Sequence, residues 1–200
     1  MERHRAITEI LAGLRVTEGS FDDLVPAVYD ELRGLAHAQL RRLAAGQRAG
    51  AVDTTELVHE AYLKLSAAEP RWQSRRHFFA AAAKVMRHIL TDAARMSQAA
   101  KRGGDAPHLP LGDVELVLAQ KTETVLAIDA ALEELATRLP RLAELVEYRF
   151  FGGLNEEEIA EMQGTSTRTV RRDWVKARAW LHRHMERSAP VDPGDVPGET

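Results

Sequence analysis

The chain has 200 residues, which is enough for one ordinary domain or two small ones. Hydrophobic residues make up 44% and charged residues 28%, a globular balance that argues against general disorder. The lack of cysteine excludes disulfides, thiolate catalysis and Cys-ligated metal centres, and it predicts a reducing, cytoplasmic location. No apolar run has the length of a secretory signal or a membrane span, so we expect neither.

Charge is distributed unevenly along the chain, although the formal net charge is only −3. Residues 71–102 contain eight basic residues against one acidic residue, and residues 164–187 contain seven against two. The segment 133–163 between them contains eight Glu against three Arg. Two basic islands in an otherwise acidic chain indicate polyanion binding, although two solvated helix faces would give the same pattern.

Helical periodicity covers most of the sequence, and no convincing strand pattern occurs. We therefore predict an all-α fold of two small helical domains joined by a flexible linker. Gly103, Gly104 and Pro107 mark the start of that linker, because both residue types oppose helix continuation. The expected divisions are an N-terminal extension at 1–20, a helical bundle at 21–100, a linker at 101–124, a helical domain at 125–187 and a disordered tail at 188–200.

The N-terminal domain is predicted to contain three helices, preceded by a shorter helix at 4–16. The first of the three covers about 24–40, where apolar residues recur three to five positions apart. The second starts with Asp53 as its N-cap and Glu56 at the reciprocal capping position. The third runs over about 76–99 and carries much of the first basic island.

The stretch 152–172 is the most informative part of the sequence. Asn155 is expected to cap a short helix, with Glu158 completing a capping box. Gly164 then gives a tight turn, and Ser166 caps a second helix. The apolar residues of that second helix, which should pack inward, are Val170, Trp174, Ala177 and Leu181. This order predicts a helix-turn-helix, whose second helix enters the major groove of DNA.

The outward side of this second helix offers hydrogen-bond donors to DNA. Arginine can present two donors to guanine O6 and N7, and threonine can serve several bases. A helical hairpin with a solvated basic face is the alternative interpretation. The candidate DNA-binding residues on this helix are Thr167, Arg168, Thr169, Arg171, Arg172 and Lys176.

The sequence does not suggest an enzyme. Ser and Asp occur without a companion base at a known catalytic spacing, and there is no glycine loop to cradle a phosphate. His182 and His184 are two residues apart and face different sides of a helix, so we expect no metal site. We also expect no cofactor.

Three motifs in chain order resemble the extracytoplasmic function (ECF) type of the sigma-70 family of bacterial transcription initiation factors, over about residues 21–187. The stretch 53–65 is similar to that family's region 2.2, usually D-A-E-D-L-V-Q-E followed by an apolar helix. The stretch 153–178 is similar to region 4.2, a helix-turn-helix ending in a basic helix. Regions 2.3 and 2.4 are matched by Phe78, Val85, Asp92 and Arg95.

The resemblance implies two domains, sigma-2 and sigma-4, that bind core RNA polymerase and promoter DNA. Sigma-2 would open and read the −10 element, and sigma-4 would read the −35 element. The expected polymerase-binding residues in region 2.2 are Asp53, Thr54, Thr55, Glu56 and Glu60. The expected −10 contacts combine cations with an aromatic ring, as single-strand capture requires. They are Arg71, Trp72, Arg75, Arg76, His77, Lys84, Arg87, His88, Thr91 and Arg95. Trp72 is also compatible with a half-buried packing role.

The chain departs from the usual pattern in region 2.2, where Thr54 and Thr55 stand in place of Ala-Glu. It also has Ala81-Ala82 where many relatives have Trp-Leu. These features resemble a subgroup often found beside serine/threonine kinases. We expect both hydroxyls to be exposed at a helix start, so that phosphorylation would supply the missing negative charge for polymerase binding. Two ordinary helix-start threonines, or regulation by an anti-sigma factor instead, are the alternatives.

Two other functions remain compatible with the residues. The chain could be a polymerase-independent helix-turn-helix regulator, which would bind a palindrome by itself. It could also be a helical adaptor in which the basic islands are incidental. Transcription with purified core polymerase separates all three.

Overall fold

The computed structural model describes residues 25–43, 53–67, 75–102, 111 and 113–188. These residues form helices joined by short connections, and no strand occurs among them, which confirms the all-α prediction. The helix expected at 4–16 lies outside the described residues, and so does the tail expected at 188–200, except for Ser188, which ends α8. No helix in the described ranges is both long and apolar enough to cross a membrane.

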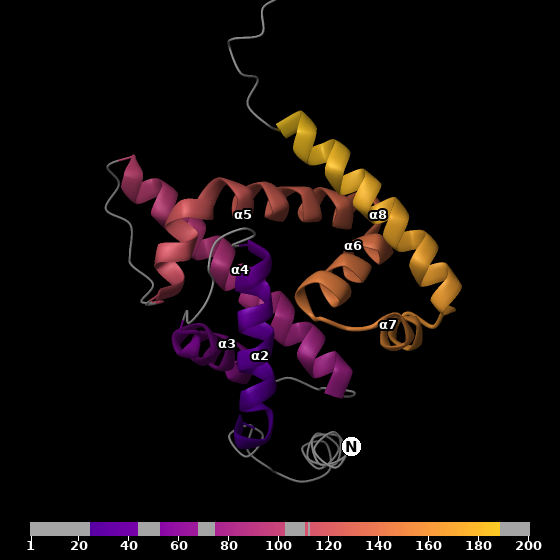
Figure 1. Ribbon diagram of the computed structural model, residues 1–200, viewed down its shortest axis with the longest axis horizontal. Helices are drawn as coiled ribbons and strands as arrows, with labels where there is room; N and C mark the ends of the chain where they lie inside the picture. The colour runs from indigo at the N-terminus through magenta and orange to yellow at the C-terminus, as the bar shows by residue number, and fades with distance from the viewer. Residues whose placement is uncertain (1–24, 44–52, 68–74, 103–110, 112, 189–200) are drawn as a thin grey trace, which may run out of the picture.

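Three helices make up the N-terminal part: α2 (Val25–Leu43), α3 (Thr55–Ala67) and α4 (Arg75–Lys101). Each packs against the other two, and Figure 1 shows α2 and α3 lying together beside α4. Their shared interior is apolar, because each helix turns one stripe of hydrophobic residues inward. Fully buried side chains from the three helices are Leu40, Leu57, Leu65, Phe78, Met86 and Ile89.

The C-terminal part begins with the long helix α5 (Asp113–Arg138), followed by α6 (Pro140–Val146) and a π-helical turn, η2 (Glu147–Phe151). The helix-turn-helix consists of α7 (Glu156–Met162) and α8 (Thr167–Ser188). Pro140 separates α5 from α6, because a proline opposes helical backbone in the residue before it; Leu139 has φ −142° and ψ 67°. At the first position of α6 the missing proline N–H costs nothing.

The second half of the segment expected as a linker is helical. The chain is helical again from Asp113, so α5 covers the second half of the predicted linker at 101–124. Val114, Leu118 and Val125 recur at helical spacing, and all three are buried. An apolar stripe of this kind stabilises a helix against a neighbour, and the neighbour is α4. Residues 103–110 and 112 lie outside the described residues.

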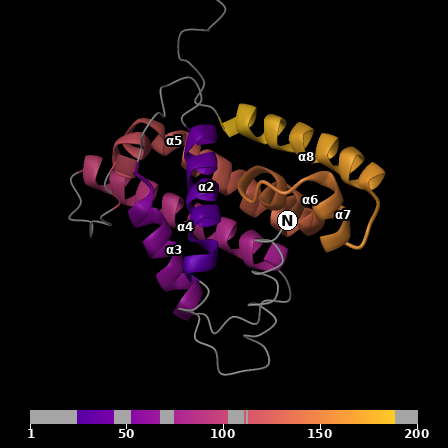
Figure 2. The same ribbon diagram turned by 60° about the horizontal axis from the view of Figure 1, so that its bottom comes forward.

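The N-terminal and C-terminal parts lie against each other. In both views α5 crosses α4, and the element contacts place η2 on α4 as well (Figures 1 and 2). One hydrophobic core continues through both parts, from Leu40 and Phe78 to Leu135 and Phe151. Gln39 joins them further, since its Nε2 donates to the carbonyl oxygen of Ala83 at 3.1 Å and to that of Phe151 at 3.4 Å.

Candidate nucleic-acid interface

The helix-turn-helix is built by local capping. Asn155 Oδ1 accepts from the Glu158 backbone N–H at 2.9 Å, and Glu158 Oε2 accepts from the Asn155 N–H at 3.0 Å, which confirms the predicted capping box. Gly164 follows with φ +60°, a left-handed conformation that side chains disfavour and glycine adopts freely. Ser166 Oγ then accepts from the Thr169 N–H at 3.2 Å and caps α8, as predicted.

The inner face of α8 matches the predicted apolar spacing. Val170 and Ala177 are buried, and Trp174 and Leu181 are half-buried. Val170 belongs to a small second core, and Trp174 packs against both cores. The packing of these residues fixes which side of α8 faces away from the protein.

The outer face of α8 is basic and exposed. The side chains of Arg171 and Arg172 are each 65% exposed, and that of Lys176 is 58% exposed. Arg168 is exposed as well. Thr167 is half-buried; Thr169 is also half-buried, and its Oγ1 lies 3.1 Å from Ser166 Oγ within the cap. Val175 is also on this face and is 67% exposed. The sequence analysis did not name it, although Val175 falls outside the inward spacing of the other apolar residues of this helix.

A series of contacts links this face of α8 to the start of α7 and to η2. Arg171 Nε donates to Glu156 Oε2 at 2.5 Å, and Arg149 Nη1 donates to Glu156 Oε1 at 3.1 Å. The Arg149 guanidinium lies over the Trp174 ring, 4.7 Å from its centroid. The hydrogen bond from Arg171, followed by that from Arg149, lowers the pKa of Glu156 below its usual value, so the carboxylate stays charged.

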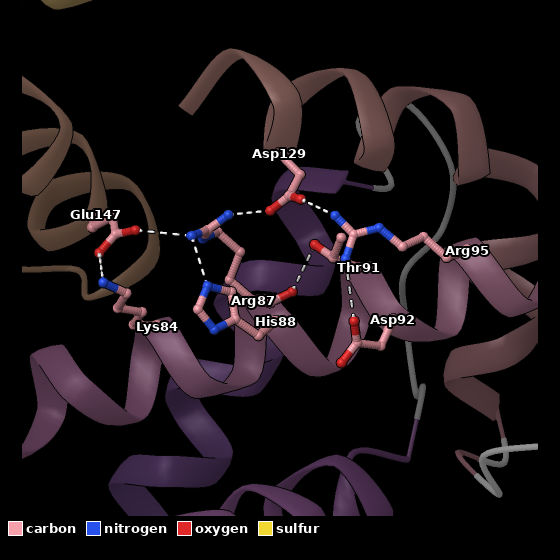
Figure 3. Close-up of polar contacts among 8 residues, drawn as sticks. All are labelled: Lys84, Arg87, His88, Thr91, Asp92, Arg95, Asp129 and Glu147. Atoms are coloured by element: carbon pink, nitrogen blue, oxygen red, sulfur yellow. Dashed lines mark hydrogen bonds and ion pairs between the residues drawn. The ribbon is translucent and has the colours of Figure 1, made fainter. Parts of the chain in front are cut away.

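The basic residues of α4 have a different environment. Arg87 has an 8% exposed side chain and pairs with Asp129 of α5, and its Nη2 lies 3.0 Å from Glu147 Oε1 of η2 (Figure 3). Arg95 Nη2 lies 2.9 Å from the other Asp129 oxygen. Lys84 Nζ lies 4.0 Å from Glu147 Oε2. Arg76 pairs with Glu161 of α7 and lies 3.9 Å from Glu158. Acidic residues of the C-terminal part therefore pair with all four of these cations, of which Arg87 is buried.

Two predicted DNA contacts on α4 are buried in this structure. Arg87 and Thr91 are 6% and 2% exposed, and Thr91 Oγ1 donates to the Arg87 carbonyl oxygen at 3.0 Å. Arg87 lies four residues after buried Ala83 and three before buried Leu90, so it shares their face. Because α5 packs against α4 here, these two predicted contacts are inaccessible in this arrangement, and their −10 role stays a prediction.

His88 and Arg95 are exposed beside this buried pair. They line an open cleft of about 340 Å³ between α3, α4 and α5. His88 Nε2 lies 2.9 Å from Arg87 Nη2. Partial desolvation of the ring, and then the charges of Arg87 and Lys84, lower the pKa of His88, whereas Glu147 and Asp129 oppose the shift. The imidazole can therefore accept from Arg87 in its neutral form.

The predicted polymerase-binding residues begin α3. Asp53 Oδ1 accepts from the Thr55 N–H at 3.0 Å and from Thr55 Oγ1 at 2.6 Å. The helix begins at Thr55, one residue later than an Asp53 N-cap predicts, but the Asp53 side chain does accept from the first backbone N–H of the helix. Glu56 does not complete the expected box, since its Oε2 is buried without a hydrogen-bond partner. Glu60 is half-buried and Asp53 is exposed.

Thr54 and Thr55 differ in accessibility. Thr55 is exposed as expected, whereas Thr54 is 0% exposed, so the expectation of an exposed Thr54 is wrong. Thr54 lies three and four residues before the buried Leu57 and Val58, so it lies on the same inward face. Sequence reasoning started the inward face at Leu57, one turn too late.

The remaining predicted −10 contacts and the candidate metal ligands are described only in part. Arg71 and Trp72 lie outside the described residues, and only the backbone of Arg75 is described. His77 is half-buried at the start of α4. Within the described ranges no three His, Asp or Glu side chains are grouped to hold a metal ion. His182 instead lies 3.2 Å from Glu186, and His184 lies 3.0 Å from Glu134.

The capped helix-turn-helix and the basic α4 fit the resemblance noted in the sequence, and a family comparison decides the assignment. Residues 4–187 match the family model described as ECF sigma factor. The chain belongs to the ECF sigma factor family. No curated protein and no solved structure matches it.

The assignment supplies the general function. An ECF sigma factor is a transcription initiation factor that directs RNA polymerase to promoters, so promoter DNA and the core polymerase are its partners. The family is not an enzyme family. The two basic helices, α4 and α8, are then the candidate promoter-binding elements.

Proposed function

We propose that this ECF sigma factor reads the −35 element with α8 and reads and opens the −10 element with α4. The observation that carries the first part is the exposed basic face of Arg168, Arg171, Arg172 and Lys176 on a capped helix-turn-helix. A recognition helix enters the major groove with its N-terminal residues, which is where these side chains lie. Val175 is an apolar side chain on the same face and suits contact with a thymine methyl group.

The −10 role requires a second arrangement of the protein. In this structure α5 and η2 cover Arg87 and Thr91, so DNA cannot reach them. Asp129, Glu147 and Glu161 occupy positions beside α4 cations that phosphates would take. We propose that polymerase binding draws the C-terminal part away from α4, which then meets DNA with Lys84, Arg87, His88 and Arg95. This movement replaces internal ion pairs by phosphate contacts.

The start of α3 is the proposed polymerase-binding surface. Asp53 and Thr55 are exposed there, and one turn further along the same side His59 is exposed too. Leu63, a further four residues on, is 45% exposed and supplies an apolar contact. An exposed acidic helix start beside an apolar side chain suits a basic coiled coil of the large polymerase subunit.

Within this surface we propose that a serine/threonine kinase regulates polymerase binding through Thr55 and not through Thr54. The phosphoryl group of ATP would be transferred to Thr55 Oγ1, which is exposed, whereas Thr54 Oγ1 is buried. A phosphate carries about −1.5 to −2 charge at neutral pH and is favoured at a helix start. Together with Asp53 it would form one concentrated negative patch. Regulation by an anti-sigma factor stays an alternative that Thr55 substitutions would not affect.

Run-off transcription with purified core polymerase over a promoter library tests the main proposal. The wild-type protein should select one pair of −35 and −10 sequences, and Arg168→Ala/Arg172→Ala should lose selection at −35 alone. Tight binding to a palindrome without polymerase, combined with no specific initiation, would favour an autonomous regulator instead.

Affinity for core polymerase tests the regulatory part. Thr55→Glu should bind the core more tightly than wild type, and Thr55→Ala should not respond to the kinase. Thr54→Val is the matched control, since it removes the buried, unpartnered hydroxyl at similar volume and should respond to the kinase as wild type does. Equal core binding by the wild-type, Ala and Glu forms of Thr55 at one salt concentration would exclude this regulation.

A further inference from the structure

Arg171 differs from the other basic residues of α8 in how firmly its guanidinium is held. Its Nε donates to Glu156 Oε2 at 2.5 Å, and among the described residues Glu156 is its only side-chain partner. The bond uses Nε, so the two terminal nitrogens stay available, and the side chain is 65% exposed. Those two nitrogens form the planar fork with which arginine binds guanine O6 and N7.

The neighbouring cations have longer contacts or, among the described residues, no ion pair. Arg172 Nε lies 3.4 Å from Asp173 Oδ1, at the limit of a hydrogen bond, and Lys176 Nζ lies 3.6 Å from the same oxygen. Arg168 has no ion pair with any described residue. These three side chains keep rotational freedom that they would lose on binding a base.

Glu156 is itself held in place. Its Oε1 accepts from Arg149 Nη1 at 3.1 Å, and its side chain is only 22% exposed. Arg149 in turn lies over the ring of Trp174, which packs against both hydrophobic cores. A continuous path of contacts therefore runs from the core through Arg149 and Glu156 to Arg171.

We propose that Glu156 is a positioning residue that presents the Arg171 fork to one guanine of the −35 element, and so sets base specificity at that position. The proposal rests on the proposed role of α8 in −35 reading. A guanidinium already fixed by its Nε loses less freedom when it binds, and it meets one base edge in one orientation.

Glu156 should also lower the affinity of the protein for DNA of any sequence, which is the opposite of its proposed effect at one guanine. A carboxylate at the DNA-facing side of the helix-turn-helix repels phosphates, so it lowers binding to any sequence. A residue that merely stabilises the fold would lower all binding when it is replaced. A positioning carboxylate should instead lose discrimination at one base while binding to unrelated DNA is maintained or rises.

The matched variants are Glu156→Met and Glu157→Met. The first removes both acceptor oxygens at similar side-chain length, and the second removes the adjacent exposed carboxylate, which makes no ion pair with Arg171. Arg171→Ala identifies the base that Arg171 reads. Glu156→Gln keeps one acceptor oxygen and is included in case the Met variant melts at a lower temperature.

The experiment measures transcription by the full-length protein with core polymerase from promoters in which each −35 position is randomised, together with holoenzyme binding to unrelated duplex DNA. Glu156→Met should reduce preference for the Arg171-dependent guanine about tenfold, with a smaller reduction for Glu156→Gln. Binding to unrelated DNA should stay level or increase, and Glu157→Met should keep the wild-type base profile.

Three results would count against the inference, and they are distinguishable. An unchanged base profile in both Glu156 variants would overturn it, and so would equal losses at every −35 position, which indicate a structural role. If the wild-type protein selects no −35 sequence, the proposed function of α8 fails first and the inference fails with it.

Discussion

The two basic helices of this sigma factor carry similar charges but differ in what those charges meet. On α8 the side chains of Arg171 and Arg172 are 65% exposed and lie on the outer face. On α4 the Arg87 side chain is 8% exposed and lies between Asp129 and Glu147. The basic side chains of α8 are accessible to a binding partner in this structure, whereas Arg87 of α4 is engaged within the protein.

The cause of the difference is Asp129 together with the acidic segment 133–163 that follows it. The segment forms the end of α5, α6, η2 and α7. Helix α5, η2 and α7 pack against α4, whereas α8 turns its outer face away from the protein. Charge counts along the sequence do not distinguish these two situations. A basic island indicates affinity for an anion, but the anion can be a carboxylate of the same chain.

Removal of Asp129 should have the largest effect, because it leaves Arg87 and Arg95 without their shared carboxylate. Asp129→Ala should lower the free energy of unfolding by about 3–5 kcal/mol, the usual loss when one partner of a buried pair is removed. Denaturant unfolding measures it. Asp92→Ala is the matched control, since Asp92 is a 44% exposed carboxylate beside Arg95 and its loss should cost at most about 1 kcal/mol.

A double variant that replaces the Arg87–Asp129 ion pair by apolar residues separates the loss of the pair from the loss of one partner. Arg87→Met combined with Asp129→Leu should recover most of the lost stability, because apolar residues of similar volume often replace a buried ion pair without loss. If Asp129→Ala and Asp92→Ala destabilise the protein equally, the two carboxylates are equivalent and the contrast between α4 and α8 does not hold.

Trp174→Ala should have the next largest effect, this time on α8. The residue packs against both hydrophobic cores and lies beneath Arg149, so its loss should lower stability by about 3 kcal/mol. Calorimetric melting measures the loss. Trp174→Phe keeps an aromatic ring and should lose less. An unchanged melting transition with lost DNA binding would make Trp174 a contact residue and not a packing residue.

The sequence predicted the local parts of this protein well. The capping box of Asn155, the turn at Gly164 and the inward spacing of Val170 and Ala177 all depend on residues within one or two helical turns. Interactions over such short distances can be inferred from spacing alone. The family resemblance could be recognised for the same reason, since its motifs are continuous in sequence.

The contacts between distant segments could not be predicted in this way. Arg87 and Asp129 are far apart in the chain, and nothing in the spacing around either residue indicates the pair. Thr54 shows a smaller error of the same kind, because it is buried in an α3 that packs against both α2 and α4. The −35 role of α8 and the −10 role of α4 stay predictions that the transcription experiments test.

Arg172→Ala should affect function and leave stability unchanged, as expected for a residue on the free side of α8. If Arg172 contacts a base, promoter discrimination should fall by about 1–3 kcal/mol in transcription competition assays. Arg183→Ala is the control, since it removes an exposed cation of the same helix three turns further on. Wild-type transcription from every promoter by Arg172→Ala would show that Arg172 contacts no base.

The smallest expected effect is a pH dependence of the contact between α4 and η2. The pKa of His88 is lowered by partial desolvation of the ring first and then by Arg87 and Lys84, against the opposing charges of Glu147 and Asp129. Between the lowered pKa and the ordinary value of about 6.5, the unfolded chain binds a proton that the folded chain does not. The free energy of unfolding should therefore fall as pH decreases through that window, and the His88 contribution is fully present above it.

Denaturant unfolding at about pH 7.5 and about pH 5.5 measures the change, and His88→Gln, which does not titrate, should show a smaller fall than wild type. No comparable pH dependence of stability is expected from α8, because its partner Glu156 has a lowered pKa and stays charged over this range. An equal fall in the free energy of unfolding of wild type and His88→Gln would show that protonation of His88 does not destabilise the contact between α4 and η2.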